Sequence, residues 1–156
     1  VTAAGALMDS EVTNLAAVKA FAAGDYATAA QGTTADAALP KAGGAMTGAA
    51  QGSTDTDATN TGSVTLNFST NQNFVLTLTG AVTLANPTTE VVGQSGFITF
   101  IQDGTGSRVV SLGTDYETAA GAGLTLTSTA SATDIVPYVV VAAGRILLGT
   151  PQLAFS

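Results

Sequence analysis

The stretch Ser63-Val-Thr-Leu-Asn-Phe-Ser-Thr-Asn-Gln-Asn-Phe-Val-Leu-Thr-Leu78 decides the fold, because its large apolar side chains recur at every second residue. A β-strand points successive side chains to opposite faces, so such a row shares one face of a sheet. Thr70-Asn71-Gln72-Asn73 interrupts the row with residues typical of a hairpin connection. The stretch therefore predicts two antiparallel strands with one buried face. The residues expected on that face are Val64, Leu66, Phe68, Phe74, Leu76 and Leu78.

The same period continues towards the C-terminus. Asp103-Gly104 predicts a second hairpin, between strands at Phe97–Ile101 and Val109–Leu112. We count about eight short strands, with turns roughly every 8–12 residues, which is typical of antiparallel sandwiches and jelly rolls. Residues 63–156 are therefore predicted to form an antiparallel β-sandwich or jelly-roll-like head domain, and the fold class is mainly β.

Residues 1–62 have a different pattern and are rich in Ala, Gly and Thr. Apolar residues at helical spacing between Met8 and Phe21 predict one short helix, and a second is expected from Asp25 towards Leu39, before Pro40. Gln51–Gly62 is polar and is predicted to be a linker or exposed loop. The chain begins at Val1 without a methionine, and we expect it to be a processed product or part of a longer polypeptide.

This first segment contains too few large apolar side chains to offset the ordering of its chain, which costs about 1–2 kcal/mol per residue. Its apolar row is nevertheless too regular for a plainly disordered tail. We therefore predict a helical and irregular stem that becomes ordered by packing against identical chains, with a homotrimer as the expected assembly. The predicted interface residues are Met8, Val12, Leu15, Val18, Phe21, Leu39 and Met46.

The composition excludes several classes of function. The chain has no histidine and no cysteine, so it can form neither a Ser-His-Asp triad nor a Cys/His zinc site. Four Lys and Arg residues against eleven Asp and Glu give a net charge of −7, which does not suit nucleic acid or an anionic membrane. No apolar run reaches the roughly 18–20 residues needed to cross a bilayer. No metal and no cofactor are predicted.

Two acidic groups deserve comparison with known sites. Asp55, Asp57 and Asn60 superficially match a calcium loop, but the glycine and glutamate that an EF-hand requires later in the loop are missing, so a solvated linker is favoured. Asp115 and Glu117 would share one face of a strand, as paired carboxylates of a glycosidase could, but their spacing alone does not establish the required separation. We predict that the chain is not an enzyme.

The segment Ala38-Leu-Pro-Lys-Ala-Gly-Gly-Ala-Met-Thr-Gly48 resembles a linker motif of tailed-bacteriophage tail-fibre proteins, A-L-P-K-x-G-G-x-M-T-G. The upstream segment from Ala6 to Leu15 is also similar to segments of such fibres. The resemblance covers roughly residues 1–50. It implies a homotrimeric fibre of the virion surface that attaches the particle to a bacterium.

The expected function is therefore a structural and adhesive segment of a bacteriophage tail fibre. Its expected partners are identical chains, other virion proteins, and a carbohydrate or protein of the host surface. Two alternatives stay open at this point: a capsid decoration or head-fibre protein, and a bacterial surface adhesin or filament module.

Four residues are candidates for contact with a receptor: Asn71, Gln72, Asn73 and Tyr116. Together with Tyr138, the amides and tyrosines could form a platform that stacks on sugar rings and hydrogen-bonds to them. The alternative is that the Asn-Gln run only closes a hairpin while Tyr138 packs at a sheet edge.

Overall fold

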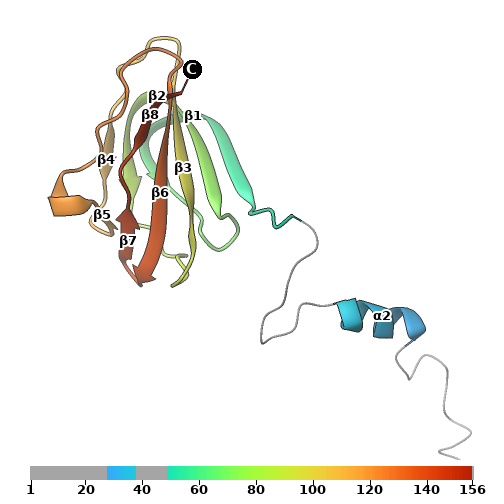
Figure 1. Ribbon diagram of the computed structural model, residues 1–156. Helices are drawn as coiled ribbons and strands as arrows, with labels where there is room; N and C mark the ends of the chain where they lie inside the picture. The colour runs from blue at the N-terminus through green and yellow to red at the C-terminus, as the bar shows by residue number, and fades with distance from the viewer. Residues whose placement is uncertain (1–27, 38–48, 156) are drawn as a thin grey trace, which may run out of the picture. The chain divides into compact units, whose positions relative to one another are not determined.

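The computed structural model of the chain describes residues 28–37 and 49–155 (Figure 1). The chain divides into two compact units, Val1–Ala49 and Ala50–Ser156. In the first unit the structure describes helix α2 (Ala29–Ala37), which lies within the stretch predicted to be helical. Thr28 and Gln31 cap its first turn reciprocally: the Gln31 amide N donates to Thr28 Oγ1 at 3.2 Å, and the Thr28 amide N donates to Gln31 Oε1 at 2.6 Å.

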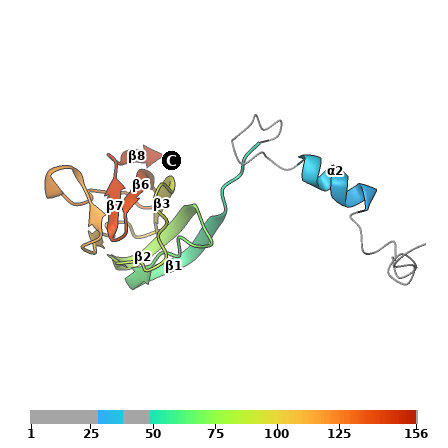
Figure 2. The ribbon, with the colours of Figure 1, turned by 90° about the horizontal axis from the view of Figure 1, so that it is seen from below.

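The second unit is built from strands, which confirms the prediction of a mainly β fold. Eight strands are hydrogen-bonded into one sheet, with the path β1-β2-β3-β6-β7-β5, while β4 pairs with β2 and β8 with β6. Seen from below, the sheet curls around a single core (Figure 2). The strands are β1 (Thr54–Thr65), β2 (Asn73–Ala85), β3 (Ser95–Gln102), β4 (Val110–Leu112), β5 (Tyr116–Glu117), β6 (Thr133–Ala142), β7 (Arg145–Leu148) and β8 (Gln152–Phe155).

The predicted antiparallel pairing is wrong for four of the ladders. β1–β2, β2–β3, β2–β4 and β5–β7 are parallel, and antiparallel pairing is confined to the ladders of β6 with β3, β7 and β8. The two predicted hairpins are absent from these ladders. Thr54 pairs with Asn73, so β2 starts beside the start of β1, and β3 and β4 both pair with β2 instead of with each other. Alternating hydrophobicity identifies the buried face of a strand but is the same for both directions of pairing.

Bends in the long strands allow this arrangement. The register of β1 against β2 shifts on both sides of Asn60, and both strands curve over the core (Figure 1). Such bulges bend a strand and increase its twist. The chain therefore returns to the start of β1 through residues 66–72, and β2 offers its first half to β3 and its second half to β4.

The polar stretch Gln51–Gly62, predicted as a linker, mostly belongs to β1. Nearly all of its side chains are exposed, so its strand structure depends on backbone pairing with β2. Asn60 is its one buried residue in β1, and its Nδ2 donates to the carbonyl oxygens of Asp57 at 3.0 Å and Thr77 at 3.2 Å. The β unit consequently begins at Ala50, earlier than the predicted boundary between residues 62 and 63.

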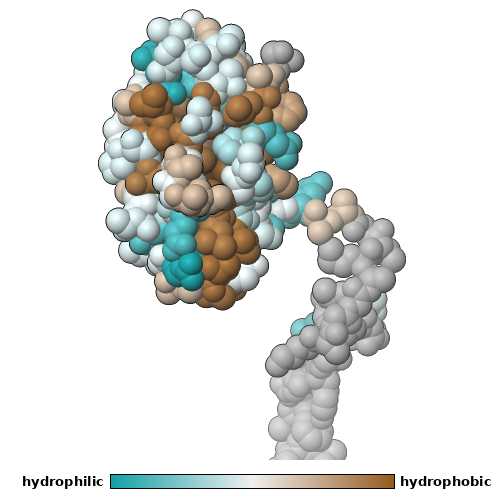
Figure 3. Space-filling view, turned by 60° about the vertical axis from the view of Figure 1, so that its left-hand side comes forward, coloured by the Kyte–Doolittle hydropathy of each residue, from teal (hydrophilic) through white to brown (hydrophobic). Residues whose placement is uncertain are grey.

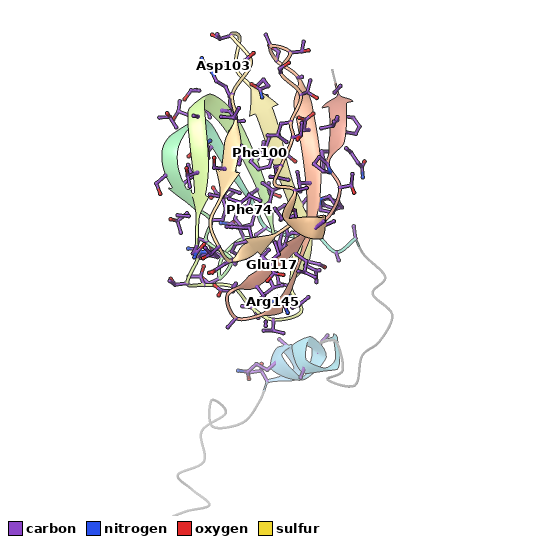
Figure 4. The ribbon with its side chains drawn as sticks, turned by 90° about the vertical axis from the view of Figure 1, so that its left-hand side faces the viewer. Phe74, Phe100, Asp103, Glu117 and Arg145 are labelled. Atoms are coloured by element: carbon purple, nitrogen blue, oxygen red, sulfur yellow. The ribbon has the colours of Figure 1, made fainter. Side chains whose placement is uncertain are left out.

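The core confirms the alternation that was read from residues 63–78. Leu66, Phe68, Phe74, Leu76 and Leu78 are buried, whereas Val64 is half-buried against them. The rings of Phe68 and Phe74 meet edge to face with centroids 5.0 Å apart. Figure 4 shows Phe74 and Phe100 in the interior of the unit.

Candidate functional site

The loop predicted to face a receptor, Asn71–Gln72–Asn73, lies where β1, β2 and β3 begin. The backbone amides of Gln72 and Asn73 donate to the Ser53 carbonyl at 2.8 and 2.9 Å. Gln72 Nε2 donates to the Ser95 carbonyl at 2.9 Å, and Asn73 Oδ1 accepts from the backbone amide of Phe97 at 3.1 Å. These groups therefore tie three strands together, and Gln72 remains exposed.

Tyr138 completes this clamp. Its hydroxyl donates to the Gln72 carbonyl at 2.6 Å, and its ring packs edge to face on Phe68 with centroids 5.3 Å apart. Burial raises the pKa of Tyr138 to about 12. Tyr138 lies in β6, which has neighbours on both sides, so it neither sits at a sheet edge nor offers its ring to a sugar.

Tyr116, one of the four predicted contact residues, is buried in the single chain. It lies in β5, is only 5% exposed and belongs to the hydrophobic core. Burial raises the pKa of its hydroxyl, with further contributions from the charges of Asp115 and Glu90. In the sequence, the charged residues Asp115 and Glu117 flank Tyr116. This alternation is typical of a strand with one buried position, so it could have predicted that Tyr116 is buried.

The two carboxylates considered for sugar cleavage have separate structural partners. Glu117 accepts from Arg145 Nε at 2.7 Å and from Arg145 Nη2 at 2.8 Å, and these bonds lower the pKa of Glu117 (Figure 4). A general acid needs the opposite shift. The carboxylate of Asp115 accepts from Thr114 Oγ1 at 3.4 Å, and the backbone amide of Asp115 donates to Asn86 Oδ1 at 3.1 Å.

A second polar cluster follows β3, at the end of the unit opposite the Glu117–Arg145 pair (Figure 4). Asp103 Oδ1 accepts from the backbone amides of Thr105 at 3.0 Å and Gly106 at 2.9 Å, while Asp103 Oδ2 accepts from Arg108 Nη2 at 2.8 Å. Gly106 has a φ of 74°, which other residues adopt only with strain. Asp103 thus stabilises the turn that was predicted to close a hairpin.

Arg108→Gln is expected to raise the pKa of Asp103 from about 2 towards its ordinary 3.8, because the hydrogen bond from Arg108 is the main cause of the lowered pKa. A lowered pKa in the folded state stabilises the fold above the unfolded pKa, and this contribution is lost as the pH falls from about 4 to 2. The variant should therefore lose less stability over that interval. Carboxyl NMR titration measures the pKa directly; Arg145→Gln is the control, and an unchanged Asp103 pKa in Arg108→Gln would contradict the assignment.

The outward side of the sheet contains a hollow of about 490 Å³ that the sequence analysis did not identify. The sequence nevertheless contains a sign of this hollow. Val75, Phe97 and Ile135 lie between buried core residues, at outward positions where a fully solvated face would have polar residues. Figure 3 shows that hydrophobic residues reach the surface of the unit in several patches. The hollow is lined by Thr54, Asn73, Val75, Phe97, Thr99, Ile135 and Gln152.

A larger hollow, of about 630 Å³, lies between β4, β5 and the segment that follows them. Its walls include Leu112, Tyr116, Glu117 and Leu124. Among residues 28–37 and 49–155, no group of three or more Asp, Glu, His or Cys residues is placed to hold a metal ion. Within the same ranges, no helix has the length and apolarity to cross a membrane.

The predicted stem interface lies outside the described residues, and so does the linker motif Ala38–Gly48. The assembly residues therefore stay predictions. They are Met8, Val12, Leu15, Val18, Phe21, Leu39 and Met46.

Comparison with known proteins gives one result. Residues 56–145 match the family described as "Putative phage tail fibre C-terminal domain". No curated protein and no solved structure matches the chain. The family match begins within β1, ends at the first residue of β7 and covers more than half of the 156 residues. The chain therefore belongs to this family of phage tail-fibre domains and has a structural role in a virion-associated fibre.

Proposed function

We propose that three identical copies of the chain assemble into a segment of a tail fibre, and that this segment attaches the virion to a bacterial surface. The observation that carries the proposal is the family match over residues 56–145, which favours a tail fibre over a capsid decoration protein. In this proposal the partners are identical chains, other virion proteins and a host-surface carbohydrate or protein. The role is adhesive and structural, without catalysis.

The stem supplies the first argument for assembly. Helix α2 has nine residues, and the side chains of Ala29, Gln31 and Thr33 are exposed. Isolated helices shorter than about 12–15 residues are marginal in water. Packing against the stems of two further copies would stabilise α2 and bury the predicted apolar row between Met8 and Phe21.

Native mass spectrometry of the purified chain tests the assembly. We expect a species of about 46 kDa, three times the 15.3 kDa of one chain. A stable monomer across the micromolar range would contradict the trimer. Attachment is tested separately: excess purified chain should reduce adsorption of the phage to its host, and unchanged adsorption would contradict the adhesive role.

Leu15→Asp is expected to weaken assembly by about 30-fold or more, equivalent to about 2 kcal/mol, because it puts a charge into a predicted apolar seam. The β-sheet circular dichroism should not change, since the β unit has its own core. Asn14→Asp is the matched control, because it adds the same charge one residue away from the apolar row. Equal assembly of Leu15→Asp and the parent, followed by sedimentation over a dilution series, would refute the stem interface.

A further inference from the structure

The outward face of β2, β3 and β6 has apolar residues in each of the three strands, with uncharged polar residues between them. Val75 of β2 pairs with Thr99 of β3, and Thr99 pairs in turn with Ile135 of β6. Two residues before Thr99, Phe97 of β3 pairs with Pro137 of β6. The residues between these positions, such as Ile98 and Val136, are fully buried in the core, so the row just described is on the other side of the sheet.

This outward face is open to solvent in the single chain. Phe97 is 50% exposed, and Val139, two residues beyond Pro137 and on the same face, is 37% exposed. The hollow of about 490 Å³ lies on this face, and a second one of about 390 Å³, lined by Gly96, Phe97 and Pro137 among others, adjoins it at Phe97. Contiguous exposed apolar surface on a soluble protein marks an interaction site.

The charge distribution indicates which partner fits. None of the described outward residues of β2, β3 and β6 is ionisable, although the chain carries a net charge of −7. Copies with this net charge repel one another wherever their acidic residues approach. An uncharged face is the surface on which two such copies can pack without burying unpaired carboxylates.

The sheet edge is a poorer surface for self-association. β1 ends the hydrogen-bonded path and is therefore an edge strand. Asp55 and Asp57 lie on it and are exposed. Charged residues on an edge strand oppose pairing with another edge, so β1 is a poor surface for pairing between identical copies.

The position of the outward face fits an assembly that starts in the stem. Thr54, the first residue of β1, lines the hollow of about 490 Å³, and Gly52 lines the hollow of about 390 Å³. The chain thus enters the β unit at the rim of the apolar face. Copies joined through the chain before Gly52 would each begin their β unit at the rim of this face.

We infer that the outward face of β2, β3 and β6 is the surface through which the β units of identical chains pack against one another. This inference rests on the proposed trimer and adds the surface that the β units use. It commits to a second copy of the chain as the occupant of the face, with Phe97 as the central apolar residue.

The first experiment compares Phe97→Asp with Val109→Asp by native mass spectrometry of the full chain. Both residues are apolar and exposed, Phe97 at 50% and Val109 at 61%, but Val109 adjoins the second half of β2, where β2 pairs with β4 and not with β3. We expect Phe97→Asp to weaken assembly by about 30-fold or more and Val109→Asp to leave it unchanged. Equal assembly of Phe97→Asp and the parent would overturn the inference and leave the trimer standing.

The second experiment uses the absence of cysteine from the sequence. A single Phe97→Cys should give a cross-linked two-chain product under mild oxidation, whereas Val109→Cys should not. If the parent is trimeric and Phe97→Cys gives no cross-linked product, the inference is overturned. Cross-linking within one chain in the double variant Leu15→Cys, Phe97→Cys would also overturn it, by showing that the chain's own stem covers the face. A parent that is monomeric in both experiments would refute the proposed trimer itself.

Discussion

Replacing Asp134 with alanine is expected to lower the free energy of unfolding by about 3–5 kcal/mol, because three hydrogen-bond donors lose their buried acceptor together. Asp134 is 2% exposed. Its carboxylate accepts from the backbone amide of Thr127 at 2.6 Å, from Thr127 Oγ1 at 2.8 Å and from the backbone amide of Ala154 at 2.8 Å. The side chain therefore holds the segment before β6 and strand β8 against β6. Urea denaturation at constant protein concentration measures the loss.

Asp134→Asn is the matched control for this prediction. Its amide oxygen keeps one acceptor in nearly the same volume, so we expect a loss of about 1–3 kcal/mol. Similar stability of the alanine variant and the parent would show that the three hydrogen bonds do not stabilise the fold. Solvent would then have to replace the carboxylate at both backbone amides.

The second large effect is expected for Phe74→Ala, which should cost about 3–5 kcal/mol through lost burial and the cavity left behind. Phe74 is fully buried, and its ring contacts those of Phe68 and Tyr138. It also lies in β2, which pairs with β1, β3 and β4, so relaxation around the cavity would have to move several strands. Thermal unfolding followed by circular dichroism gives the difference.

Phe155→Ala provides the comparison for Phe74→Ala. Phe155 is the same residue type but is 46% exposed, and its replacement should cost well under 1 kcal/mol. Equal losses at the two positions would mean that the aromatic cluster does not carry the stability of the core.

The burial of Phe74 could be predicted from the sequence, whereas the burial of Asp134 could not. The burial of Phe74 follows from a row of alternating apolar residues, and this local pattern was read correctly. The burial of Asp134 does not follow from any pattern, because a carboxylate is buried only where donors from other segments converge on it. Thr127 and Ala154 supply those donors from seven and twenty residues away.

In the candidate site, too, the sequence identified residues whose contacts only the folded structure shows. From the sequence, Asn71, Gln72 and Asn73 were predicted to form a turn and to be candidate receptor contacts. Their role in joining three strands depends on Ser53, Ser95 and Phe97, which come near only in the folded sheet. Tyr116 was proposed as a stacking platform because tyrosine can serve both a core and a binding surface, and only the folded sheet shows that it is buried. The polar stretch before Gly62 was misassigned as a linker because an edge strand needs backbone pairing and few buried side chains.

From the sequence by itself came the mainly β fold, the buried face of residues 66–78 and the absence of histidine and cysteine chemistry. These properties depend on composition and on the period of neighbouring side chains, which are local. Only the tertiary structure decided that β1, β2 and β3 run parallel, that Asp134 is buried and that an uncharged face with exposed apolar residues remains outside. Every strand has the same backbone donors and acceptors, so the sequence does not show which strand pairs with which or in which direction. These features arise only when distant segments meet.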